Sequence, residues 1–202
     1  MTTTDTVADA PTVLVVDDDR ELAEMYAYQL DGAYTVRTAY SGQQAIDALD
    51  ESVDVMLLDR RMPRVPGRHV LESVRASEFD CRVIMVTAVD PGFDIVDLPC
   101  DDYLCKPVSK RTLEATIDQQ LAARSYDRSV RELLRAISKL AVLEATKPDS
   151  ELAVSARYQE LTQQVAATRQ EAESSVTELA AVESAFSAID RSTTWDSRQA
   201  GI

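Results

Sequence analysis

The 202-residue chain has little of several residue types, and each shortage excludes a class of protein. With one histidine, His69, and three cysteines, Cys81, Cys100 and Cys105, it lacks both the ligand clusters of a zinc site and an even disulfide framework. We expect reduced, buried thiols and a His69 on a helix surface. No apolar run approaches the roughly 18 residues of a membrane span, so no membrane association is expected.

The opening decapeptide, MTTTDTVADA, has neither the basic nor the apolar region of a signal peptide, so a cytoplasmic location is expected. Lysine is scarce, with four against 17 arginines, and 35 acidic residues against 21 basic ones leave a net charge of −14. An acidic surface of this kind keeps chains apart in concentrated salt. We infer a halophilic source, an archaeon.

Short β-branched and apolar runs alternate with helical patterns over the first 123 residues. Strands are expected at 12–16, 34–39, 53–59, 82–88 and 102–107, and helices at 20–31, 41–51, 67–76 and 109–123. This order predicts a doubly wound, five-stranded parallel sheet of the flavodoxin-like α/β class. Between 88 and 102, Pro91, Gly92 and Pro99 leave room only for a short or irregular fourth helix.

Beyond residue 123 the sequence favours helices almost without glycine. We expect one helix at 126–146 and a second from Pro148 to about Ile189, forming an α-helical hairpin or coiled coil. The second helix carries an apolar seam that could pack on the first helix or on another chain in a homodimer. The seam runs through Tyr158, Leu161, Val165, Thr168, Ala172, Ser175, Leu179, Val182, Phe186 and Ile189. The expected domains are 11–123 and 124–190, between a disordered N-terminus (1–10) and a disordered tail (191–202).

Acidic residues end two of the expected strands. Asp17 and Asp18 follow the first and Asp59 follows the third, and these strands are neighbours at the switch point of such a sheet. Three crowded carboxylates need a counter-charge, for which Mg²⁺ with its preference for oxygen ligands is suited. Thr87 and Lys106 end the fourth and fifth strands. Asp59 is therefore a candidate nucleophile toward a phosphoryl group, with Lys106 and Mg²⁺ neutralising its oxygens.

Residues 11–123 resemble the receiver domain of two-component response regulators. The resemblance rests on Asp17-Asp18, Asp59, Met62-Pro63 with Gly67, Thr87-Ala88, the sequence DDYL at 101–104, and Lys106-Pro107.

The resemblance implies phosphoryl transfer from a cognate histidine kinase to Asp59. It also implies Mg²⁺ bound by Asp18, Asp59 and the backbone carbonyl of Arg61, with Asp17 acting through water. Thr87 and Tyr103 would form a switch pair in which the tyrosine ring moves inward, and the Lys106–Pro107 bond would be cis. Apart from self-phosphorylation and autodephosphorylation, no enzyme activity is expected.

The sequence leaves open the roles of two groups of basic residues. Arg60 and Arg61 could steer an incoming phosphohistidine or line the approach of hydrolytic water. Residues 124–147, the only basic segment at +3, present one helical face that points to solvent, to the acidic receiver or to nucleic acid. This basic stripe consists of Arg124, Arg128, Arg131, Arg135 and Lys139.

The C-terminal region resembles the helical HalX-type domain that follows receivers in haloarchaeal regulators. This implies an output that regulates transcription or a protein partner. No helix-turn-helix, zinc-finger or winged-helix signature is present, so direct DNA binding and a purely protein-interacting or dimerising module both stay open.

Overall fold

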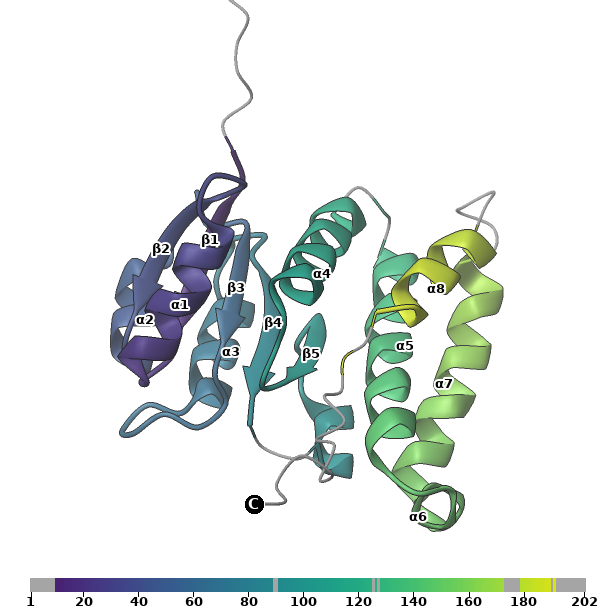
Figure 1. Ribbon diagram of the computed structural model, residues 1–202. Coiled ribbons are helices and arrows are strands. Elements are labelled where there is room, and N and C mark those ends of the chain that lie inside the picture. Colours follow the sequence, from purple (N-terminus) through teal and green to yellow (C-terminus); the bar gives the residue numbers. More distant parts are fainter. Residues whose placement is uncertain are drawn as a thin grey trace, which may run out of the picture.

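The computed structural model describes residues 10–88, 91–124, 126, 128–172, 179–189 and 191. Five parallel strands form one sheet in the order β2-β1-β3-β4-β5 (Figure 1). The strands are β1 (Thr12–Val16), β2 (Thr35–Ala39), β3 (Val55–Leu58), β4 (Arg82–Thr87) and β5 (Asp102–Cys105). The expected doubly wound α/β fold is confirmed.

Two helix layers cover the sheet. Helices α1 (Arg20–Leu30) and α4 (Lys110–Ala123) pack on one face, over Val15, Leu57 and Ile84. Helices α2 (Gly42–Ala48) and α3 (Gly67–Ala76) pack on the other. Side-chain oxygens of Asp19, Ser41 and Ser109 accept hydrogen bonds from the first turns of α1, α2 and α4, which fixes where these helices begin.

In the described part of the fourth connection, which lacks residues 89 and 90, the helical structure is a short 3₁₀ segment, η1 (Phe93–Asp97), as the prolines and glycine predict. The sheet face beside it is instead covered by α5 (Arg128–Thr146), which lies along β5 (Figure 1). Leu133, Leu134 and Ile137 of α5 are buried in the same core as the α2–α3 face. The first helix of the C-terminal region therefore takes the place of the missing fourth helix.

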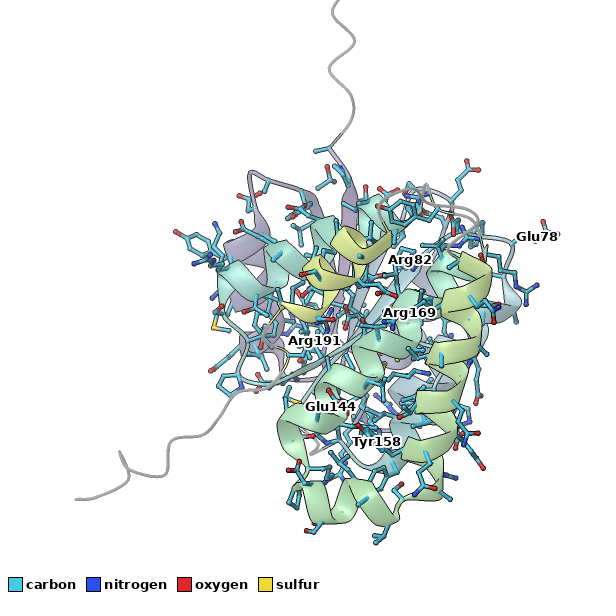
Figure 2. The ribbon with its side chains drawn as sticks, turned by 90° about the vertical axis from the view of Figure 1, so that its right-hand side faces the viewer. Glu78, Arg82, Glu144, Tyr158, Arg169 and Arg191 are labelled. Carbon is cyan, nitrogen blue, oxygen red and sulfur yellow. The ribbon has the colours of Figure 1, made fainter. Side chains whose placement is uncertain are left out.

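Helix α7 (Ala156–Ala172) returns along α5 after the short α6 (Asp149–Val154), so the expected helical hairpin is present. Leu161 and Val165 are buried against α5, and Tyr158 donates a hydrogen bond to Glu144 at 2.7 Å (Figure 2). The apolar side of α5 and the first part of the seam, Tyr158 to Val165, thus pack against each other within one chain.

The expectation of one helix as far as Ile189 is wrong. Helix α7 ends at Ala172, and a separate α8 (Leu179–Ser187) packs back against α5. Arg169 Nε lies 2.8 Å from Glu183 Oε1, whereas 14 residues of continuous helix would separate them by about 21 Å. The middle of the seam carries small residues, which hold a long helix weakly, while Phe186 gains burial by folding back. Ser175 lies outside the described residues.

Several smaller expectations can be compared with the structure. The Lys106–Pro107 bond is cis, and His69 is exposed. The three cysteines are free; Cys81 and Cys100 are buried as expected, whereas Cys105 is only half-buried. No helix in the described ranges is long and apolar enough to cross a membrane. Most of the two segments expected to be disordered lies outside the described residues. Arg191 contradicts the expectation, because it is only 2% exposed and bonded to Asp102.

Gly67 sits where α3 begins against the end of β3. A Cβ there would overlap the main-chain oxygen of Asp59 and lie 3.0 Å from Arg60 Cα, so no flexible atom could yield. We predict that Gly67→Ala lowers the free energy of unfolding by about 1–3 kcal/mol in urea denaturation. Gly92→Ala is the control, because its Cβ meets only the Asp94 side chain. Equal stabilities of the two variants would contradict this close approach.

Candidate functional site

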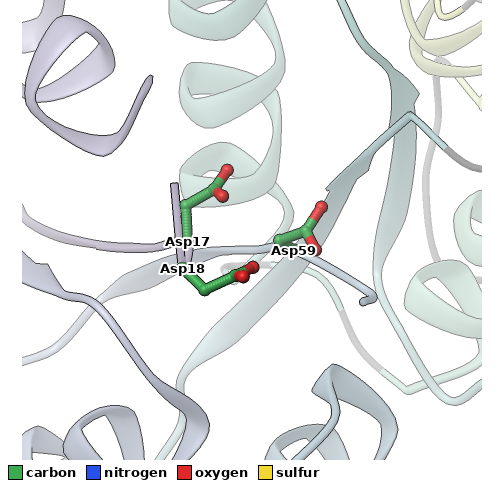
Figure 3. A group of neighbouring side chains, drawn as sticks. All are labelled: Asp17, Asp18 and Asp59. Atoms are coloured by element: carbon green, nitrogen blue, oxygen red, sulfur yellow. The ribbon is translucent and has the colours of Figure 1, made fainter. Parts of the chain in front are cut away.

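Three carboxylates gather at the carboxyl edge of the sheet. Parallel pairing places Val16 opposite Leu58, so Asp17 and Asp59, which follow these residues, end neighbouring strands. The amide of Asp59 donates to the carbonyl of Val16 at 2.9 Å, which extends this pairing by one residue. Oxygen atoms of Asp17, Asp18 and Asp59 all lie within 4.8 Å of one another (Figure 3). Asp17 and Asp59 are buried, whereas Asp18 is exposed at the entrance.

Lys106, just after β5, reaches into this group. Its Nζ donates to Asp17 Oδ2 at 2.5 Å and to Asp59 Oδ1 at 2.9 Å. Its amide donates to the carbonyl of Thr87 at 2.9 Å, which fixes the lysine to the end of β4. The second oxygen of Asp59 accepts a hydrogen bond from the amide of Arg61 at 2.7 Å. The Asp59 carboxylate is therefore held in one orientation.

The electrostatics of the site leave negative charge uncompensated. Burial raises the pKa of Asp17 despite its hydrogen bond to Lys106. Burial acts to lower the pKa of Lys106, but its bonds to Asp17 and Asp59 outweigh this and raise it. Three carboxylates and one ammonium carry about −2 when all are ionised, beside a cleft of about 330 Å³. An oxygen-only donor set of this charge fits a hard divalent cation.

Thr87 and Tyr103 lie on the same face of neighbouring strands. Met85 pairs with Tyr103, and Thr87 follows two residues later, so the two side chains are diagonal neighbours. Thr87 lines the cleft, whereas Tyr103 is 0% exposed in the core shared with α5. Burial raises the pKa of Tyr103 to about 12. In this structure the ring is already in an inward position.

The side chains of Arg60 and Arg61 lie in different surroundings. Arg61 lines the cleft, as expected for a residue near an incoming phosphoryl group or water. Arg60 does not: its guanidinium pairs with Asp94 of η1 and hydrogen-bonds Tyr103. Arg60 is not among the residues that line the cleft in this structure, and its two sequence-based roles, steering phosphohistidine or lining the path of water, stay predictions.

Three members of the basic stripe face the receiver. Arg124 pairs with Asp54 and, at 3.4 Å, with Asp80, while Arg135 Nη2 lies 2.6 Å from Asp101 Oδ1. Lys139 Nζ donates to the carbonyl of Val96 in η1 at 2.7 Å, and burial lowers its pKa.

The other two members of the stripe are placed differently. Arg128 is 87% exposed in its side chain and pairs with Glu132, and Arg131 is half-buried. The receiver is thus the observed partner of three of the five side chains of the stripe, of which Arg124 and Arg135 stay about one-third exposed.

A buried cluster centred on Asp101 was missed by the sequence reasoning. The carboxylate accepts from Arg75 at 2.6 Å, from Arg82 at 3.0 Å and from Arg135, and also from the amide of Val83 at 2.6 Å. Burial raises the pKa of Asp101, but the three guanidinium groups outweigh it, so the net shift is downward. Two features of the sequence could have indicated this cluster: an arginine, Arg82, at the start of a buried strand, and the acidic pair in the sequence DDYL.

The neighbouring Asp102 forms a second buried pair. Its two oxygens accept from Arg191 Nε at 2.6 Å and Nη2 at 2.9 Å. The carbonyl of Arg191 accepts from the amide of Cys105 at 2.9 Å, so the chain after α8 is bonded to the edge strand β5. Nothing in the sequence around Arg191 indicates this long-range contact.

Five parallel strands with three carboxylates and a lysine at their carboxyl edge define a receiver-type domain, and comparisons with known proteins agree. The family model of the response regulator receiver domain matches residues 13–118, and that of the HalX domain matches residues 122–189. The chain therefore belongs to the response regulator receiver family, with a HalX segment after the receiver. The resemblances drawn from the sequence are confirmed.

Individual relatives share parts of the chain. A Haloferax volcanii protein named "Putative transcriptional regulator" is 48% identical over 134 residues, 66% of this chain and 23% of that protein. Escherichia coli CpxR, a transcriptional regulatory protein, is 41% identical over 109 residues, 52% of this chain and 47% of CpxR. The receiver domain of a Pseudomonas aeruginosa sensor histidine kinase, solved with magnesium in its active site cleft, has a TM-score of 0.52. It is 23% identical and covers 56% of this chain and 98% of that domain, a likeness in fold.

The lowered pKa of Asp101 predicts how the stability of the chain depends on pH. Ionised Asp101 stabilises the folded chain above its ordinary pKa of 3.8, and this stabilisation is lost as pH falls through the lower folded value. Asp101→Asn should therefore lower the free energy of unfolding at pH 7 by about 3–5 kcal/mol. Between pH 5 and 2, the free energy of unfolding of this variant should also fall less steeply than that of wild type, as measured from urea midpoints at each pH. Asp80→Asn, which removes an exposed partner of Arg124, is the control and should cost below about 1 kcal/mol.

Proposed function

We propose that this response regulator accepts a phosphoryl group on Asp59 from a cognate histidine kinase and thereby switches its helical region. The observation that carries the proposal is the Asp59 carboxylate, 6% exposed, held between Lys106 Nζ and the Arg61 amide at the edge of an acidic cleft. A nucleophile that is oriented in advance loses little freedom when it attacks.

The transfer step follows from these contacts. An oxygen of Asp59 attacks phosphorus, the new O–P bond forms as the P–N bond to the kinase histidine breaks, and the imidazole leaves. Lys106 and the Thr87 hydroxyl then face the three phosphoryl oxygens. By the resemblance, Asp18, Asp59 and the Arg61 backbone carbonyl would hold Mg²⁺, with Asp17 acting through water, and the bound ion would supply further positive charge there. The same groups would serve autodephosphorylation.

Thr87 and Tyr103 are proposed as the switch pair, on the resemblance and on their diagonal placement. Because Tyr103 lies under the C-terminal helices and hydrogen-bonds Arg60, its position and the docking of α5 are linked. A change at Asp59 can therefore reach the helical region through this ring.

The output is proposed to be regulation of transcription or of a protein partner, since both named relatives are described as transcriptional regulators. The alternative is a phosphorylation-controlled interaction or dimerisation module without direct DNA binding. One observation favours this alternative for the docked form: Arg124, Arg135 and Lys139 are bound to the receiver rather than free for phosphates. A homodimer through the seam would likewise require the hairpin to rearrange.

The direct test of the function is intact mass and size-exclusion behaviour with Mg²⁺ and acetyl phosphate as phosphodonor. Wild type should gain one phosphoryl group, whereas Asp59→Ala should gain none, because the attacking oxygen is missing. Asp80→Ala, an exposed acidic residue, is the control and should behave as wild type. An adduct on Asp59→Ala, or none on wild type, would contradict the proposal, and a shift in elution would place the output in self-association.

The proposed metal ligands make a separate prediction. Mg²⁺ at a hundredfold excess over its dissociation constant should raise the free energy of unfolding by about 2.7 kcal/mol. Asp18→Asn should remove most of this gain, because one carboxylate of the three is lost. Asp19→Asn is the matched control, since asparagine still caps α1 and Asp19 is outside the three-carboxylate group. The stabilisation by Mg²⁺ is measured by thermal unfolding with and without the ion. Equal stabilisation of the two variants would exclude Asp18 as a ligand.

A further inference from the structure

The buried cluster around Asp101 has more hydrogen-bond donors than acceptors. Oδ1 of this carboxylate is shared by Nη1 of Arg82 at 3.0 Å and by Nε and Nη2 of Arg135 at 2.7 and 2.6 Å. Oδ2 accepts from Nη2 of Arg75 and from the amide of Val83, both at 2.6 Å. Two carboxylate oxygens offer about four lone-pair sites, so these donors exhaust their capacity. Any further donor in the cluster has to find an acceptor elsewhere.

One such donor is present on Arg82. Its Nε is buried and has no hydrogen-bond partner among the described residues, and the residue as a whole is only 2% exposed. The other two nitrogens of this guanidinium are used, because Nη1 contacts Asp101 and Nη2 donates to Gln120 Oε1 at 3.0 Å. The unpaired N–H therefore belongs to a group that already touches the central carboxylate. A buried, charged donor without an acceptor is costly, so a small acceptor is expected beside it.

The cluster and the ion pairs next to it also carry surplus positive charge. Four guanidinium groups and three carboxylates leave one positive charge, although the chain as a whole is at −14. The pKa of Arg82 is lowered to about 10, first by burial and then by Arg135 and Arg75, while Asp101 acts in the opposite direction. A single negative charge would neutralise the group. Its members are Arg75, Arg82, Arg124, Arg135, Asp54, Asp80 and Asp101.

We propose that this cluster is a binding site for a small monovalent anion of the halide type, with Nε of Arg82 and the guanidinium of Arg135 as its donors. A monatomic anion supplies the missing acceptor and the missing negative charge together, and it requires no donor of its own. Arg75 is less suited, because its Nε and Nη1 donate to the carbonyls of Pro99 and Cys81 at 2.7 and 3.0 Å. The side chain of Arg135 is 31% exposed, so the cluster is open to solvent on that side.

The anion site lies away from the acidic cleft and combines both family segments. Arg82 begins β4 and Asp101 precedes β5, so the site is at the amino edge of the sheet, whereas the cleft is at the carboxyl edge. Arg135 comes from α5, so the site is complete only in the folded full chain. A bound anion therefore stabilises the native fold in proportion to its occupancy, independently of phosphorylation. Concentrated salt, to which the acidic composition is suited, fills even a weak site of this kind.

Thermal unfolding of the full chain tests the site, with sodium gluconate replaced stepwise by sodium chloride at constant ionic strength. At a hundredfold excess over its dissociation constant, chloride should raise the Tm of wild type by about 5–10 °C. Arg135→Gln should lose most of this rise, because a donor and the surplus charge are removed together. Arg128→Gln, which changes an exposed arginine of the same helix, is the control and should respond as wild type.

Asp101→Asn should change the response in the opposite direction. It leaves the arginines with one more uncompensated charge, so chloride should raise its Tm, relative to its own value in gluconate, by more than that of wild type. Crystals of the full chain grown in sodium bromide should show anomalous scattering beside Nε of Arg82. Equal chloride responses of wild type and Arg135→Gln would mean that water completes the cluster, and bromide found only elsewhere would likewise overturn the site. If Asp101→Asn does not fold, these two results decide.

Discussion

A parallel sheet has to be covered on both faces, and this requirement shapes the whole chain. Prolines and a glycine shorten the fourth connection, whose described part holds the 3₁₀ segment η1 beside β5. The exposed part of the sheet is covered by α5, whose apolar side joins the core of α2 and α3. The burial of Tyr103 and the contacts of the basic stripe with the receiver follow from that replacement. The helical region is thus part of the receiver's own packing.

The acidic cleft depends on the same sheet. Buried apolar strands end at one edge, and each places a polar residue there: Asp17, Asp59, Thr87 and Lys106. Burial raises the pKa of Asp17, so its negative charge is kept at some cost in stability. Lys106 offsets only part of the charge, and a site with spare negative charge is suited to bind a divalent cation. The cost in stability thus falls at the acidic cleft, where the phosphoryl chemistry is expected.

Much of this was accessible from the sequence because it depends on local patterns. Apolar runs located the five strands, and strand order then brought Asp17 and Asp59 together. The spacing of the basic stripe predicted one helical face, but Arg124 ends α4, and of the members on α5 Arg135 and Lys139 contact the receiver while Arg128 points to solvent. The sequence could not show what these side chains meet. The position of the Arg60 side chain, the partner of Arg191 and the end of α7 depend on contacts between residues far apart in sequence. The small residues at 168 and 172 indicated weak packing of a long helix but not the position of a turn.

The place of α5 limits how such regulators can evolve by gene fusion. A receiver with its own fourth helix can be joined to many outputs, because its core is complete. Here a recombination point after residue 123 would cut through a shared core and leave part of β5 and η1 uncovered. A new output would have to begin with a helix that matches this surface in shape and charge. We therefore expect the two segments to be inherited together, with α5 and the η1–β5 segment changing in concert over evolutionary time.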